Sequence, residues 1–272
     1  MSYFKDKRIL ITGVGSGLGR RMALGMAREG AMIIGWDISG EALEKVLEEL
    51  KLASGREHAG YVCDVSNRAS VYETAEKVKH EAGPPDILIN NAGVVTGKRF
   101  LDCDDKEIER TLGVNTLALF WTAKAFLPGM ISRNQGHIVT VASAAGLVGV
   151  AKLADYCASK FAAFGFDESL RAEFRQIAPN VRTTVICPFY ITTGMFEGAR
   201  THFPWLLPIL SESYAADRMV AAIRRQRPRL LMPYLVYTIP LLRLMPVWVF
   251  DRIANFLGIN VSMEDFKGRR NS

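Results

Sequence analysis

Short runs of apolar, often β-branched residues recur along the chain and alternate with longer segments in which apolar residues appear every three or four positions. The apolar runs are RILIT, AMIIGW, AGYVC, DILIN, HIVTVA, RTTVI and RLLM, and a segment of the second kind is GEALEKVLEELKLAS. The runs are typical of strands buried on both faces, and the longer segments of amphipathic helices. Their alternation predicts a doubly wound, Rossmann-like α/β fold with a parallel sheet of about seven strands and helices on both faces. Ligands of such a sheet bind beyond the carboxyl ends of the strands.

Length and composition favour a single domain over residues 1–272. The 272 residues, 49% of them hydrophobic, can bury one large core, and no linker-like stretch divides them. The four cysteines lie far apart without a C-x-x-C pair, which indicates a reducing, cytoplasmic setting. The start MSYFKDKRILITG passes directly into a strand, so no signal peptide is expected. The four histidines lack metal-ligand spacing, and no metal site is expected.

The net charge of +6 resides in the C-terminal part of the chain. From Asp217 to Ser272, ten Lys or Arg residues stand against four Asp or Glu residues, with Trp248 and other apolar residues between them. This mixture suggests an anionic membrane surface or a solvated basic tail, and no nucleic-acid motif is present. Three prolines and Arg243 leave no run of the ~20 apolar residues that cross a bilayer. For the apolar, basic extension 233–272, peripheral membrane contact and a subunit contact in a homodimer or homotetramer stay open.

A glycine-rich turn follows the first expected strand. Thr12–Arg20 reads TGVGSGLGR and opens a helix that continues through MALGMAREG. Glycines let the backbone approach a pyrophosphate, and the helix N-terminus supplies free N–H groups. Glycine clusters also occur in ordinary turns and caps, so the place between strand and helix carries the prediction of a dinucleotide site.

Two acidic residues follow the next two strands. Asp37 ends the second strand, where a carboxylate accepts hydrogen bonds from the adenosine ribose and repels a 2′-phosphate. No Lys or Arg stands in Thr12–Gly19 or at the two positions after Asp37, so NAD is favoured over NADP. Asp64, with Val65 at the end of the third strand, fits an acceptor for the adenine amino group. As alternatives, each acid could cap the helix that follows it, although Ser39 could cap the second helix equally well.

Four further residues form a candidate catalytic group. Tyr156 and Lys160 are four positions apart, hence on one face of a helix. A phenol titrates near pH 10, and a neighbouring cation that favours the phenolate makes it a better base. Ser143 ends the fifth strand, and Asn115 lies in the helical segment LGVNTLALF. Taken singly, Ser143 could be a turn serine and Asn115 a buried amide that satisfies backbone groups.

In order and spacing these motifs resemble the short-chain dehydrogenase/reductase family. The motifs are T-G-x-x-x-G-x-G at Thr12–Gly19, N-N-A-G at Asn90–Gly93, then Asn115, Ser143 and Y-x-x-x-K at Tyr156–Lys160, and they span essentially the whole chain. The resemblance implies that Tyr156 is the general acid/base of a hydride transfer, that Lys160 also holds the nicotinamide ribose, that Ser143 binds the substrate oxygen and that Asn115 holds a water chain. It implies cofactor contacts by Gly13, Gly15, Ser16, Gly17, Leu18, Asp37, Asp64, Val65, Asn91, Ala92, Gly93, Tyr156, Lys160, Pro188, Phe189, Ile191 and Thr193.

The segment after the sixth strand departs from the family pattern. The resemblance implies Pro-Gly there, followed by a threonine at the nicotinamide carboxamide; Pro188 and Thr193 match, whereas Phe189 replaces the glycine. PFYITTGMF and the ending LGINVSMEDFKGR are similar to the branch with retinol dehydrogenases and their 17-beta-hydroxysteroid dehydrogenase relatives. That branch, and the apolar residues of a substrate lid at about 189–215, imply a lipophilic substrate. The lid residues could instead be core or a subunit contact.

The expected function is an NAD-dependent oxidoreductase that interconverts a lipophilic alcohol of retinoid, steroid or long-chain type and its carbonyl. Leu147 and Val148 are expected to form the pocket wall opposite the lid. The alternatives are an NAD-linked reductase of small polar ketones, with the lid used only for packing, and a catalytically idle dinucleotide-binding or lipid-surface module. The presence of Asn115, Ser143, Tyr156 and Lys160 argues against the idle module.

Overall fold

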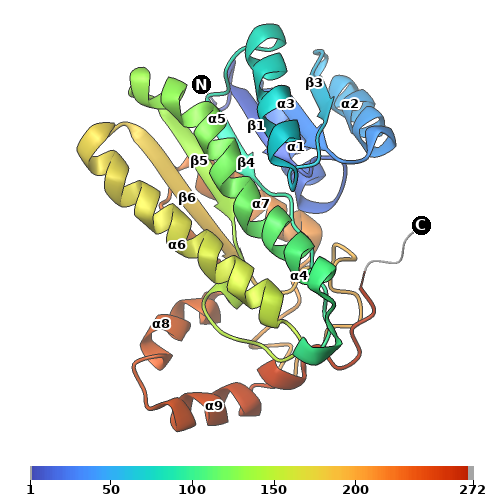
Figure 1. The fold of residues 1–272 in the computed structure, drawn as a ribbon, viewed down its shortest axis with the longest axis vertical. Helices are drawn as coiled ribbons and strands as arrows, with labels where there is room; N and C mark the ends of the chain where they lie inside the picture. The colour runs from blue at the N-terminus through green and yellow to red at the C-terminus, as the bar shows by residue number, and fades with distance from the viewer. Residues whose placement is uncertain (1, 269–272) are drawn as a thin grey trace.

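The structure, a computed structural model, describes residues 2–268 and contains a seven-stranded sheet with helices on both faces (Figure 1). The strand order is β3-β2-β1-β4-β5-β6-β7, and every neighbouring pair is parallel. The strands are β1 (Arg8–Thr12), β2 (Met32–Asp37), β3 (Ala59–Val62), β4 (Ile87–Asn90), β5 (Gly136–Val141), β6 (Val181–Pro188) and β7 (Arg229–Met232). The predicted doubly wound fold is therefore confirmed. The strand order reverses between β1 and β4, the position at which such sheets bind ligands.

Two helical layers cover the sheet. One contains α1 (Gly17–Arg28), α2 (Gly40–Ser54) and α7 (Glu212–Arg224), and the other contains α3 (Arg68–Glu81), α5 (Ala118–Ser132) and α6 (Ala154–Ile177), with α4 (Asp105–Leu112) beside α6. Successive strand residues point to opposite faces, so Ile9 and Ile11 of β1 pack under the first layer and Leu10 under the second. Trp36 of β2 lies fully buried against Phe126 of α5, with ring centroids 5.9 Å apart. The carboxyl ends of the strands are thus held between two buried apolar cores.

The helix caps settle the alternatives for the two acidic residues. Ser39 caps α2 by accepting a hydrogen bond from the Ala42 N–H (3.2 Å), and Asn67 caps α3 by accepting from two backbone N–H groups of its first turn. The capping alternatives for Asp37 and Asp64 are therefore wrong. Asp37 is the last residue of β2, and Asp64 lies in the loop that follows β3.

Three short turns connect elements on the ligand side of the sheet. These are the 3₁₀ turns η1 (Phe100–Asp102) and η3 (Ala144–Gly146) and the π-helical turn η2 (Gly113–Leu117), which interrupts the path from α4 to α5. Single π turns inside helices occur often at functional sites. The turn η2 carries Asn115.

After β7 the chain folds beyond the carboxyl edge of the sheet. It forms η4 (Tyr234–Thr238), α8 (Ile239–Leu242), α9 (Val247–Phe256) and η5 (Ile259–Val261), and α8 and α9 lie at the lower end of Figure 1. Between β6 and α7, residues 189–211 form an irregular segment, in which Ile191 pairs with Leu210. Across residues 2–268, no helix combines the length and the apolar character needed to cross a membrane.

Candidate active site

A long cleft runs along the carboxyl ends of β1 to β6. Its walls include most of the residues predicted for the cofactor and the reaction, namely Gly13, Ser16, Gly17, Leu18, Asp37, Asp64, Val65, Asn91, Ala92, Gly93, Ser143, Tyr156, Lys160, Pro188, Phe189, Ile191 and Thr193. Gly15 and Asn115 do not line the cleft, but each is hydrogen-bonded to a residue that does, Gly15 to Asp37 and Asn115 to Val94. The cleft also contains Val94, Arg110 and Val114, which the motifs did not indicate, and Met195 from the predicted lid. The fold therefore brings residues from six loops into one site.

The glycine turn allows a ligand to approach its backbone closely. Gly13 (φ 67°) and Gly17 (φ 55°) adopt the left-handed conformation that disfavours other residues. A Cβ on Gly19 would lie 2.1 Å from the carbonyl oxygen of Gly13. Asn91 braces the turn from the β4 side, because its Nδ2 donates to the carbonyl oxygens of Thr12 (2.9 Å) and Gly13 (3.2 Å). The turn leaves a smooth backbone surface at the N-terminus of α1, where an anion is favoured.

The two acidic residues border the same cleft, and each is held by backbone groups. The Asp37 carboxylate accepts hydrogen bonds from the N–H groups of Gly15 (2.8 Å) and Ser39 (3.0 Å). Asp64 accepts from the N–H (2.9 Å) and hydroxyl (2.7 Å) of Ser66 through one oxygen. Asp37 thus couples the glycine turn to the end of β2, where the ribose of a dinucleotide would lie.

Tyr156 and Lys160 enter the cleft from the first turns of α6, and both are buried. The Lys160 Nζ donates to the carbonyl oxygen of Val141 (2.9 Å) and lies 5.7 Å from the centre of the Tyr156 ring. Burial lowers the pKa of Lys160 to about 8. Burial also raises the pKa of Tyr156, and a hydrogen bond with Ser143 only partly opposes this shift. Loss of solvent is the largest of these effects, and the role of Lys160 in favouring the phenolate stays a prediction.

Ser143 serves both the turn and the cleft. Its Oγ accepts a hydrogen bond from the Ala145 N–H (3.1 Å), which caps η3, and donates to the carbonyl oxygen of Pro188 (3.4 Å). The turn-serine alternative is therefore confirmed, and the same hydroxyl borders the cleft beside Tyr156. The cap fixes the position of the hydroxyl that borders the cleft.

The Asn115 side chain makes three hydrogen bonds to protein groups. Its Oδ1 accepts from the Val94 N–H (2.9 Å), and its Nδ2 donates to the Val94 carbonyl oxygen (2.9 Å) and to the Ser159 Oγ (3.0 Å). This is the backbone-satisfying arrangement considered from the sequence. Because Val94 borders the cleft and Ser159 directly precedes Lys160, Asn115 ties the two walls together.

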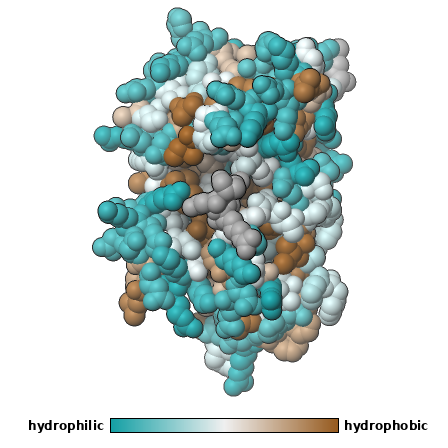
Figure 2. Space-filling view, turned by 90° about the vertical axis from the view of Figure 1, so that its right-hand side faces the viewer, coloured by the Kyte–Doolittle hydropathy of each residue, from teal (hydrophilic) through white to brown (hydrophobic). Residues whose placement is uncertain are grey.

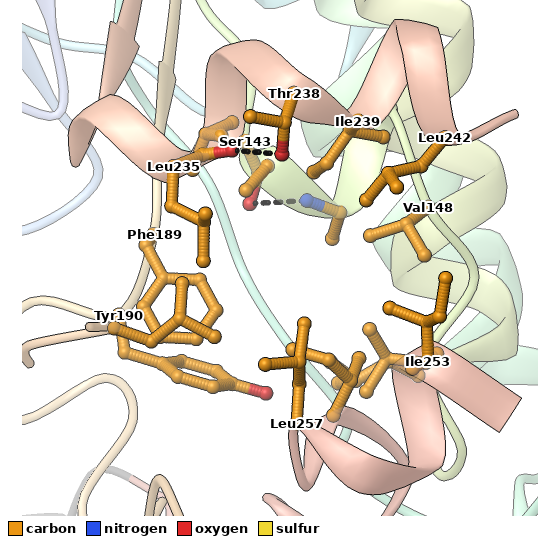
Figure 3. A pocket seen from close by; sticks show the side chains of 18 of the residues that line it. Ser143, Val148, Phe189, Tyr190, Leu235, Thr238, Ile239, Leu242, Ile253 and Leu257 are labelled. Carbon is orange, nitrogen blue, oxygen red and sulfur yellow. Dashed lines mark hydrogen bonds between the residues drawn. The ribbon is translucent and has the colours of Figure 1, made fainter. Parts of the chain in front are cut away.

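A second, apolar pocket opens beside the cleft (Figure 3). Four lining residues carry a hydroxyl group, namely Ser143, Tyr156, Tyr190 and Thr238. The other lining residues are apolar: Ala144, Ala145, Val148, Val150, Leu153, Phe189, Phe196, Leu207, Leu235, Val236, Ile239, Leu242, Phe250, Ile253, Ala254, Leu257 and Ile259. Figure 3 shows Phe189 and Tyr190 on one side of the opening and Ile253 and Leu257 on another, all around one cavity. Ser143, Tyr156, Phe189 and Phe196 line both the pocket and the cleft. The candidate reactive hydroxyls thus lie at the junction of the two spaces.

The lid predictions are met in part. Phe189, Phe196 and Leu207 line the pocket, whereas Trp205 points to solvent and is 80% exposed. Val148 forms part of the opposite wall, as expected. Leu147 does not, because it is buried in a separate core cluster with Val185 and Leu231.

The sequence interpretation missed the wall supplied by the C-terminal extension. Phe250, Ile253, Ala254 and Leu257 of α9 and its C-terminal end all line the pocket. Their spacing of three, four and seven residues is that of one helix face, and this signal was present in the sequence. Over residues 2–268, no group of three or more His, Cys, Asp or Glu side chains could hold a metal ion.

Comparisons with known proteins agree with this geometry. The family described as short chain dehydrogenase matches residues 7–203. Epidermal retinol dehydrogenase 2 of Homo sapiens is 49% identical over 260 residues, which cover 95% of this chain and 84% of the relative. Retinol dehydrogenase 10-B of Danio rerio is 43% identical over 286 residues, with 96% and 84% covered.

Two solved structures have the same fold. A short chain dehydrogenase/reductase from Burkholderia phymatum in complex with NAD has a TM-score of 0.79 at 28% identity, and the match covers 89% of this chain and 95% of that chain. A metagenomic short-chain oxidoreductase in complex with NADP has a TM-score of 0.70 at 27% identity, with 85% and 98% covered. The family resemblance of the motifs is confirmed.

Proposed function

Because the chain belongs to the short-chain dehydrogenase family, whose members are oxidoreductases that bind a nicotinamide dinucleotide, we propose that it interconverts a lipophilic alcohol and its carbonyl with NAD. The observation that carries this proposal is the junction of the two spaces. Ser143 and Tyr156 border both the dinucleotide-sized cleft and a pocket whose remaining wall is almost entirely apolar.

The cleft fits a dinucleotide through its own residues. Gly13 and Gly17 keep the turn open for phosphates, and the N-terminus of α1 favours their charge. Asp37 would accept hydrogen bonds from the adenosine ribose, and Thr193 would contact the nicotinamide end. When bound, the nicotinamide ring supplies the hydride acceptor or donor of the reaction.

The preference for NAD over NADP rests on Asp37. Its carboxylate lies against the glycine turn, where a 2′-phosphate would meet a like charge. The next residue, Ile38, is 67% exposed and carries no charge that could offset the repulsion. One related structure is a complex with NAD and another is a complex with NADP, so the fold alone does not select the cofactor. The proposed preference for NAD therefore depends on Asp37.

Side chains of the protein would transfer the proton of the substrate hydroxyl. The Ser143 hydroxyl would hold the substrate oxygen near the Tyr156 phenol. Tyr156 would accept the hydroxyl proton during oxidation and return it during reduction. Lys160 would place a positive charge beside the phenol and favour the phenolate. Asn115 would act through Val94 and Ser159, by holding the walls at a fixed separation.

The apolar pocket supports a lipophilic substrate. Apolar side chains from η4, α8 and α9 surround the space beyond the reactive hydroxyls, so a hydrocarbon chain or ring system would be desolvated there. Relatives named retinol dehydrogenases support a retinoid among the candidates. A small polar ketone would leave most of this surface without a partner.

The test compares turnover of retinoid, steroid and long-chain alcohols with that of small polar alcohols, with NAD as the acceptor. Leu242→Asn, inside the pocket, should lower kcat/KM for lipophilic alcohols by about 5- to 150-fold, because a buried amide without partners costs about 1–3 kcal/mol. The neighbouring Leu241→Asn is the matched control, since Leu241 is 68% exposed and does not line the pocket. Equal effects of the two variants, or faster turnover of small polar alcohols, would contradict the proposal.

We also propose that the protein contacts membranes peripherally through the tip formed by residues 244–248. Leu244, Met245, Val247 and Trp248 of this tip are all exposed, and the Arg252 guanidinium lies 5.2 Å from the centre of the Trp248 ring. Aromatic and apolar side chains beside cations are typical of surfaces that rest on anionic lipid. By contrast, the side of the molecule in Figure 2 is mainly hydrophilic, with its apolar residues in small groups. The inner faces of the helices beside the tip line the substrate pocket. A tip that rests on a membrane would therefore bring the pocket close to lipophilic alcohols dissolved in the lipid.

A further inference from the structure

Residues 259–268 lie across two segments that border the site. Residues 259–268, the C-terminal strap, lie against residues 189–200, the substrate loop, through two backbone hydrogen bonds. The Arg200 N–H donates to the Ser262 carbonyl oxygen (2.9 Å), and the Lys267 N–H donates to the Glu197 carbonyl oxygen (2.9 Å). On the β5 side, Lys152 Nζ donates to the strap carbonyl oxygens of residues 263 and 264. The strap is therefore bonded to the segments on both sides of the pocket mouth.

Two neighbouring strap residues point inward while their flanks are exposed. Ser262 and Met263 are buried, whereas Val261 and Glu264 are exposed. Met263 belongs to the apolar cluster that surrounds the catalytic Tyr156 and contains Tyr190. A terminal segment of this kind would be solvated unless it packed against a defined surface. The strap thus forms part of the packing around the reactive phenol.

Ser262 makes a directed hydrogen bond to a pocket residue. Its Oγ lies 2.7 Å from the Tyr190 hydroxyl and donates to the Ile259 carbonyl oxygen (2.7 Å). A serine hydroxyl has one proton, so Tyr190 must be the donor to Ser262. Burial raises the pKa of Tyr190 to about 12, and the phenol keeps the proton that it donates. The bond therefore fixes the position of the phenol end of the Tyr190 side chain.

Aromatic contacts connect the anchored Tyr190 side chain to Tyr156. The Tyr190 ring packs against Phe189 (centroids 4.6 Å apart) and Phe196 (5.1 Å), and Phe196 makes an edge contact with Tyr156 (5.7 Å). Phe189 and Phe196 both border the cleft and the pocket. We propose that Ser262 is a positioning residue, which acts through Tyr190 to hold the aromatic wall of the substrate loop against Tyr156. This inference rests on the proposed function for its effect on catalysis.

The first test does not depend on turnover. Hydrogen exchange of the substrate-loop amides should become about 5-fold faster in Ser262→Ala and Tyr190→Phe, the effect of losing one typical hydrogen bond. Ser262→Thr keeps the hydroxyl and should restore the wild-type rate. Glu264→Gln, which changes an exposed strap side chain, is the matched control. Unchanged exchange in both hydroxyl deletions, or the same acceleration in Glu264→Gln, would overturn the proposal.

The second test separates this inference from the proposed function. With a lipophilic alcohol and NAD, Ser262→Ala and Tyr190→Phe should each lower kcat about 5-fold and leave NADH affinity unchanged, and the double variant should be no worse than either single one. Additive losses in the double variant would refute the coupling through Tyr190. A wild-type protein as inactive as Tyr156→Phe on all alcohols would defeat the proposed function, whereas the exchange result would still decide the role of Ser262.

Discussion

Alanine at Gly19 would disturb the glycine turn without removing any polar group from the site. A Cβ at this position would lie 2.1 Å from the Gly13 carbonyl oxygen and 2.7 Å from the Asn91 Nδ2. Ordinary contact begins near 3.4 Å, so the turn would have to move by about 1.3 Å. The atom in the way is backbone, and no rotation of a side chain relieves the clash.

The size of the expected effect follows from that displacement. A misplacement of ~1 Å in a positioning element costs about 10²-fold in reaction rate, and we take the same factor as the scale of the loss in cofactor affinity. A 10²-fold loss of affinity removes about 2.7 kcal/mol of ligand-dependent stabilisation when the cofactor is near saturation. Gly19→Ala should therefore lose most of the rise in melting temperature that NADH produces in the wild type.

The matched control lies in the same helix. A Cβ on Gly25 would meet only Val220 Cγ2, at 3.7 Å, which is an ordinary contact. Alanine in a helix interior is more favourable than glycine by about 0.5–1 kcal/mol, so Gly25→Ala should raise the melting temperature by roughly 1–4 °C. Its NADH-dependent rise should match that of the wild type. If Gly19→Ala kept the full NADH response in thermal-shift assays, the turn would not bind the dinucleotide as argued.

Three further predictions concern the cofactor, the proton and the membrane. NAD should raise the melting temperature more than NADP does, and Asp37→Ser should shrink the difference; an equal response of the wild type to both would refute the role of Asp37. Because oxidation needs the phenolate and burial raises the pKa of Tyr156, the rate of alcohol oxidation should climb with pH through the neutral range. A rate that is already constant below pH 7, or a profile that survives in Tyr156→Phe, would contradict that assignment. The protein should co-sediment with anionic liposomes, and the double variant Leu244→Ser/Trp248→Ser should do so less. The control Leu52→Ser, at an 87% exposed site on α2, should bind like the wild type. No sedimentation of the wild type would defeat the membrane proposal.

The strands and the dinucleotide cleft could be predicted from the sequence because both depend on local patterns. Continuous apolar runs indicate strands buried on both faces, and all seven runs form strands. The β3 strand is the least buried of them, as expected for a sheet edge. A parallel sheet then places the ends of its strands along one edge, which brings Asp37, Asp64 and Ser143 to one cleft.

The pocket wall and the titration of Tyr156 were harder to predict, because both depend on long-range packing. In the C-terminal extension apolar residues face both inward and outward: Phe250 and Ile253 line the pocket, whereas Val247 and Trp248 are exposed. The exposed apolar residues hide, in the sequence, the helical spacing of the residues that face the pocket. The spacing of Tyr156 and Lys160 predicts their proximity, but the burial that raises the phenol pKa arises from segments as distant in sequence as Met263.

The position of Phe189 has a thermodynamic consequence for the two ligands. One side chain forms part of the boundary of both the cleft and the pocket, so a ligand that moves the ring from one side changes the space available on the other. Linkage requires that such an effect be reciprocal: the factor by which the cofactor changes substrate affinity equals the factor by which the substrate changes cofactor affinity. A glycine at this position would remove the contribution of this side chain to the coupling.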